Sequence, residues 1–181
     1  MKTKILIALL TIYGIANAQE KTFFPIDSVT GKIIYTEIVK ADSTTKEKLY
    51  LKGREWLANT FKSSKEVIEM DDKEAGLIIG KGTLVVSLNG DWGYIHFTVA
   101  LYFKDGRYKY EIKNITHEHP KSASGSLLGD GGAIENENPG CGKMYMTQKQ
   151  WDKIKANADS NIKILIADLK KSMLKTKSKD W

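Results

Sequence analysis

The sequence contains very little cysteine, and this scarcity limits the class of protein it can encode. Cys141 is the only cysteine among 181 residues, so no disulfide bond can form within one chain. Small secreted proteins held together by disulfide frameworks are therefore excluded. Stability has to come from an ordinary packed core, and the chain is long enough to form one.

Signatures of several enzyme classes are absent as well. The sequence has no HExxH motif of zinc proteases, and the serines at 122–126 do not form GxSxG. Gly140-Cys141-Gly142-Lys143 is superficially similar to a phosphate-binding loop. However, the earlier glycine of that loop is missing, and Met144 replaces the hydroxyl residue that would bind magnesium. We therefore expect no cofactor and favour a non-enzymatic protein.

Long apolar runs are also scarce. The longest apolar run in the sequence lies at the N-terminus. A basic start at Met1–Lys4 is followed by the apolar run Ile5–Ile15 and by Ala16-Asn17-Ala18, a small-x-small cleavage site. This order is typical of a secretory signal peptide over residues 1–18, and the run is too short to span a bilayer comfortably. The residue directly after Ala18 is Gln19 and not a cysteine, so we expect no lipid anchor and no stable membrane insertion after cleavage. The prediction is an exported protein, periplasmic or secreted.

The charge of the chain is modest once the leader is removed. Loss of residues 1–18 takes away Lys2 and Lys4 and lowers the net charge from +6 to +4. The excess is concentrated between residues 170 and 179. Because an exported chain of this charge rarely meets nucleic acid, we expect no nucleic-acid partner.

The middle of the chain predicts an α+β fold. Gly31–Ala41 is rich in β-branched and aromatic residues and predicts a strand. A capping box at Thr44–Glu47 then opens an amphipathic helix, with Gly53 on its apolar side. The Asn-Gly and Asp-Gly pairs at 89–90 and 105–106 are strong hairpin signals. They predict a four-stranded antiparallel meander, with strands at 66–70, 77–88, 93–104 and 107–116.

The composition changes after this domain, which we assign to residues 19–119. Residues 120–146 are rich in glycine and predict a long loop or linker. A second capping box, Thr147–Gln150, opens a C-terminal amphipathic helix over 147–175, followed by a basic tail over 176–181. The apolar stripe of this helix either covers the sheet or contacts another chain, and the sequence leaves both open. Its candidate contact residues are Trp151, Ile154, Ile162, Leu165 and Leu169.

The segment from Phe24 to Glu118 carries short strings in a recurring order. They include Phe24-Pro25, Trp56-Leu57, Phe61–Ser64 and Asp71–Gly76, the last followed by Ile79-Gly80-Lys81-Gly82. In this order and spacing they resemble an exported bacterial family, domain of unknown function 4468, described as having a TATA-binding-protein-like fold. The resemblance implies a curved sheet backed by helices. It implies no activity.

A concave sheet face follows from this resemblance and provides our leading candidate for a contact surface. Its residues on the third strand of the meander are Tyr94, His96, Thr98 and Tyr102. We expect a binding or envelope-associated module whose partner is a protein, an envelope component or a small ligand.

The alternative is a metal-dependent or hydrolytic enzyme. In an extended segment His117 and His119 point the same way and could offer two nitrogen ligands to zinc or copper. The acidic loop at 130–138 offers oxygen ligands of the kind that calcium prefers, although its spacing is not that of an EF-hand. Cys141 would be a nucleophile if a histidine approached it.

Overall fold

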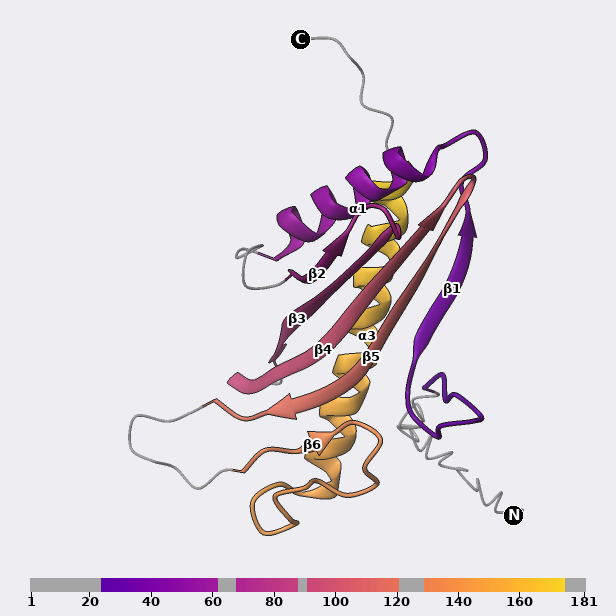
Figure 1. Ribbon diagram of the computed structural model, residues 1–181. Helices are drawn as coiled ribbons and strands as arrows, with labels where there is room; N and C mark the ends of the chain where they lie inside the picture. The colour runs from indigo at the N-terminus through magenta and orange to yellow at the C-terminus, as the bar shows by residue number, and fades with distance from the viewer. Residues whose placement is uncertain (1–23, 62–67, 88–90, 121–128, 175–181) are drawn as a thin grey trace, which may run out of the picture.

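In the part of the chain that the computed structural model describes, an antiparallel sheet is backed by two helices (Figure 1). The structure describes residues 24–61, 68–87, 91–120 and 129–174. The predicted signal peptide and basic tail lie outside these residues, as does the Asn-Gly pair at 89–90. The expected α+β class is confirmed.

The strands are joined in the order β1-β5-β4-β3-β2, and a short β6 pairs with the far end of β5. All the named pairings are antiparallel. The observed strands begin and end within a few residues of the predicted ones, and β6 was not expected. The elements are β1 (Tyr35–Lys40), α1 (Lys46–Thr60), β2 (Ile68–Asp72), β3 (Leu77–Ser87), β4 (Asp91–Lys104), β5 (Arg107–Glu118), β6 (Gly132–Ala133) and α3 (Gln148–Leu174).

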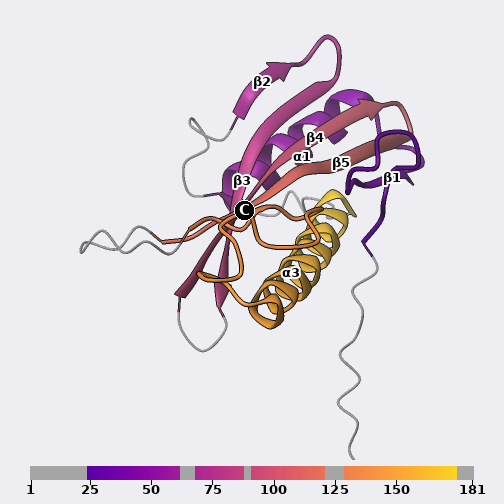
Figure 2. The same cartoon turned by 90° about the horizontal axis from the view of Figure 1, so that it is seen from below.

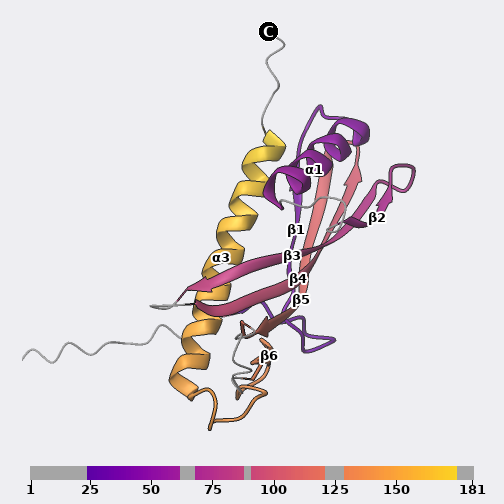
Figure 3. The same ribbon diagram turned by 90° about the vertical axis from the view of Figure 1, so that its left-hand side faces the viewer.

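Strict alternation in β4 divides the sheet into two faces. Phe97, Val99 and Leu101 are at most 2% exposed, and they point to the side on which the helices pack. Figures 2 and 3 show α1 and α3 together on this side. The hairpin to β5 turns at Asp105-Gly106, as its sequence predicts, and Gly106 has the positive φ of +70° that such a turn requires.

Helix α1 lies very close to the sheet because Gly53 has no side chain. A Cβ atom at this position would lie 2.4 Å from the Phe103 ring and 3.3 Å from Leu101. The position of Gly53 on the buried side is therefore confirmed. The N-cap of α1 is Thr45, one residue after the Thr44 of the expected capping box. The Thr45 hydroxyl accepts the backbone N–H of Lys48.

Helix α3 covers the rest of the same sheet face. Its predicted capping box is present: Thr147 Oγ1 accepts the N–H of Gln150, whose side-chain oxygen accepts the N–H of Thr147 at 2.8 Å. Neither α1 nor α3 combines the length and the apolar character that a membrane span needs. The predicted stripe is buried within the chain's own core, and it covers the sheet instead of facing outward. Its exposures are 0% for Trp151, Ile154, Ile162 and Leu169 and 6% for Leu165.

Polar contacts attach α3 to β1 and α1. Tyr35 on β1 donates a hydrogen bond to Asp159 at 2.7 Å, and Trp56 on α1 donates one to Asp168 at 2.9 Å. Further along β1, Glu37 pairs with Lys170 at 2.5 Å. Asp159 is 6% exposed, and because burying a charged group without a partner is costly, its hydrogen bond with Tyr35 fixes the position of the helix along the sheet.

The described part of the predicted loop, residues 129–146, packs against the domain. Ile134 and Met146 are at most 2% exposed, and β6 pairs with Thr116 and His117 of β5. The indole N–H of Trp151 donates to the carbonyl oxygen of Asn136 at 3.0 Å. This segment therefore extends the core around the start of α3.

Candidate functional site

The sheet face opposite the helices is the main candidate surface, because no described helix or loop lies across it (Figure 1). The predicted contact residues Tyr94, His96, Thr98 and Tyr102 all lie on this face, in alternation with the buried residues of β4. We refer to it as the open face. Neighbouring strands place Val85 beside Tyr94 and Lys81 beside Thr98.

Polar side chains form two groups on the open face. At one end, His96 Nδ1 lies 3.0 Å from the hydroxyl of Thr83, and its Nε2 lies 3.0 Å from a carboxylate oxygen of Glu118. At the other end, Glu111 accepts hydrogen bonds from Lys109 at 2.6 Å and Lys113 at 2.7 Å. Burial raises the pKa of the Glu111 carboxyl, but these two hydrogen bonds outweigh burial and hold the pKa below its ordinary value. Glu111 is therefore ionised near neutral pH and neutralises part of the lysine charge.

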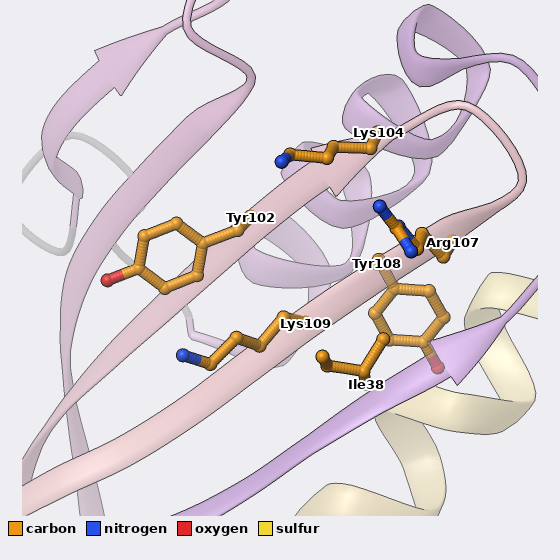
Figure 4. Close-up of a pocket in the computed structure, with 6 residues that line it drawn as sticks. All are labelled: Ile38, Tyr102, Lys104, Arg107, Tyr108 and Lys109. Atoms are coloured by element: carbon orange, nitrogen blue, oxygen red, sulfur yellow. The ribbon is translucent and has the colours of Figure 1, made fainter.

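A hollow of about 320 Å³ lies on the open face at the β4–β5 hairpin. Figure 4 shows Lys104 and Lys109 on either side of the Tyr102 ring, with Arg107 towards the hairpin and Ile38 on the neighbouring strand. The Lys109 amino group lies 5.4 Å from the centre of the Tyr102 ring, a cation–π contact. The sixth lining residue is Tyr108. The hollow thus combines cationic groups with an aromatic and an aliphatic wall.

The two histidines proposed as metal ligands have different surroundings. His117 is 2% exposed, and its Nδ1 accepts the backbone N–H of Gly131 at 3.0 Å. His119 is half-buried, and its Nδ1 lies 3.0 Å from the carbonyl oxygen of Pro120. Within the described ranges, no group of three or more histidine, cysteine or acidic side chains is arranged to hold a metal ion.

Acidic side chains of the 130–138 loop make structural contacts. Asp130 accepts the backbone N–H of His119 at 2.9 Å, and Glu135 accepts that of Ile33 at 3.1 Å. Burial raises the pKa of the Cys141 thiol, which disfavours the thiolate that a nucleophile needs. The hydrogen bonds of Asp130 and Glu135 hold the loop against the sheet domain.

Sequence reasoning identified Tyr102 but missed the cations around it. A signal was available, because alternation in β5 places Arg107, Lys109, Glu111 and Lys113 on one face. Ile38 could not be found in this way. Its place beside Lys109 depends on the pairing of β1 with β5, which joins strands far apart in the sequence.

Comparison with known proteins identifies the fold. Residues 35–118 match the family described as a domain of unknown function (DUF4468) with TBP-like fold. A TBP-like protein from Parabacteroides distasonis ATCC 8503 has 16% identity and a TM-score of 0.66, with 84% of this chain and 98% of that chain covered. A DUF4468 family protein from Bacteroides ovatus ATCC 8483 has 13% identity and a TM-score of 0.61, with 86% and 94% covered. No curated protein matches the chain.

Proposed function

Starting from a domain of unknown function with a TBP-like fold at residues 35–118, we propose that the protein is an exported, non-enzymatic binding module. Its binding surface is the open face, and its partner is an envelope component. The predicted signal peptide at residues 1–18 supports the exported location. A fold by itself does not specify a function, so the assignment depends on the surface.

The observation that carries the proposal is the apolar character of the open face. Val85 and Tyr94 are paired neighbours on adjacent strands and are 56% and 40% exposed. Met70 and Ile38, on the two outermost strands, are 47% and 63% exposed. Apolar side chains exposed next to one another, as Val85 and Tyr94 are, are typical of an interaction surface. Met70 and Ile38 add single apolar contacts at its two edges.

The surroundings of the other candidate residues support binding over catalysis. Nδ1 of His117 and a carboxylate oxygen of Glu135 each accept a backbone N–H, so both side chains help to hold the fold. The open face, in contrast, offers side chains that can meet a partner without breaking the core.

Photo-crosslinking in the native envelope tests the proposal. A photoreactive phenylalanine analogue replaces Tyr94 in one variant and Tyr102 in another. Matched control variants carry the analogue at Leu51 on α1 and at Ile164 on α3, which are 58% and 64% exposed. We expect specific adducts from the two sheet positions and none from the helix positions. Equal adducts from both sets, or no adduct from Tyr94 and Tyr102, would show that the open face is not the binding surface.

A further inference from the structure

Three cationic residues lie side by side across the open face at the β4–β5 hairpin. The pairing of the strands places Lys40 opposite Arg107 on one side and Lys104 opposite Arg107 on the other. Like charges directly opposite each other destabilise a sheet. This basic row therefore has an electrostatic cost that the strand pairing does not relieve.

The basic row forms no ion pair with a carboxylate of the described residues. Neither Lys40, Lys104 nor Arg107 makes an ion pair within the part of the chain that the structure describes. The nearby Glu111 is engaged by Lys109 and Lys113. Asp105, in the hairpin turn, accepts the backbone N–H of Lys46 at 2.8 Å. An anion at the row would relieve the repulsion and accept hydrogen bonds from these exposed donors.

The next row along the same strands provides a different kind of surface. Ile38, Lys109 and Tyr102 lie opposite one another across β1, β5 and β4. All three line the 320 Å³ hollow, together with Lys104 and Arg107 of the basic row. This volume is about ten times the ~30 Å³ that a water molecule occupies in the liquid. The hollow therefore has room for a ring-sized body as well as its charged group.

We propose that this hollow binds an anionic saccharide. Its carboxylate or phosphate group is held by Arg107 and Lys104. Its ring lies over Lys109, with Tyr102 on one side and Ile38 on the other. The planar guanidinium of arginine matches the geometry of both acidic groups. The assignment rests on the proposed function, because it names the ligand class for one end of the open face.

The test is a titration of the protein purified after its own leader has been processed. Glucuronic acid supplies a carboxylate, glucose 6-phosphate supplies a phosphate, and glucose is the neutral control. Backbone amide NMR shifts report the location of binding. We expect shifts at residues 102–109 with either acidic sugar, and none with glucose. The acidic sugar that binds more tightly shows whether the hollow prefers a carboxylate or a phosphate.

Variants then test the role of the cations. Arg107→Gln and Lys104→Gln each remove one charge-assisted hydrogen bond, and we expect each to weaken binding about tenfold. Lys153→Gln, at an exposed lysine of α3, is the matched control and should leave the affinity unchanged. Raising the ionic strength from about 0.01 M to about 1 M shortens the Debye length from ~30 Å to ~3 Å and should weaken binding as well.

Four results would overturn the saccharide assignment. They are the absence of binding by both acidic sugars, equal binding of glucose, unchanged affinity in both hollow variants, and tighter binding of a short acidic peptide than of either sugar. The proposed function is rejected by different results from those that reject the saccharide. Adducts from Tyr94 and Tyr102 without sugar binding would reject only the saccharide, whereas sugar binding without adducts would reject the wider contact with an envelope component.

Discussion

Replacing Gly53 with alanine should destabilise the protein, although alanine favours helices. In an open helix this change gains about 1 kcal/mol. Here the new Cβ atom would lie 2.4 Å from the Phe103 ring, whereas non-bonded carbons rest at ~3.5–4.0 Å. The ring is 2% exposed and packs edge-to-face on Tyr50 with centroids 5.8 Å apart, so it cannot move aside freely. Overpacking costs about 1–3 kcal/mol, and this contact belongs in the upper part of that range.

The expected net loss is therefore about 1–2 kcal/mol in the free energy of unfolding. Urea denaturation followed by circular dichroism measures it as a lower midpoint with an unchanged slope. Ala58→Gly is the matched control, since Ala58 is exposed in the same helix, and it should lose about 1 kcal/mol from propensity alone. Gly53→Ala and Ala58→Gly, although opposite in kind, should thus both lower the free energy of unfolding. A gain of stability in Gly53→Ala would refute the close approach of α1 to the sheet.

Three further changes test other contacts. Thr147→Ala removes the cap of α3 and should lower the free energy of unfolding by about 1 kcal/mol, measured by urea denaturation; an unchanged midpoint would contradict the capping box. Tyr35→Phe removes the buried hydrogen bond to Asp159 and should cost about 1.5–3 kcal/mol in the same assay, whereas Tyr145→Phe, at a 43% exposed tyrosine, should cost almost nothing. Burial and the charge of Glu37 raise the pKa of Tyr108 to about 12, above the ordinary value near 10. The folded state therefore keeps a phenol neutral that the unfolded chain ionises. Stability should be unaffected by this group below about pH 10 and should fall as the pH rises towards 12. Denaturation midpoints across this range, with tyrosinate absorbance as a second readout, check the direction.

Much of the fold could be predicted because local patterns and tertiary packing agree. The Asp105-Gly106 pair favours a tight hairpin, and alternation in β4 and in β5 as far as Lys113 sets the two faces. The α3 stripe has the spacing of a helix with one buried side, and its burial confirms that spacing. For α1, the sequence places Gly53 on the apolar side, and the structure shows the close approach to the sheet that a missing side chain allows.

Other features depend on contacts that no local pattern contains. In β5, Asn114 has a φ of +55°, and the pairing with β4 shifts between His96 and Thr98. This bulge changes which residues point inward, and His117 ends up buried. The only sign of this bulge in the local sequence is the spacing of Ile112 and Ile115, which are three residues apart within one strand. The two-residue β6 carries no pattern at all, because Gly132-Ala133 becomes a strand only by pairing with β5.

The attachment of α3 to the first strand has a consequence for the order in which the protein acquires its structure. The hydrogen bond from Tyr35 to Asp159 joins residues 124 positions apart, and the pair of Glu37 with Lys170 spans 133. Contacts of such long sequence separation form late and slow folding, because a large loop must close first. The part of the apolar sheet face that α3 covers therefore stays exposed until this last helix has been synthesised. Such delayed closure of the core is compatible with the export that we propose for this protein.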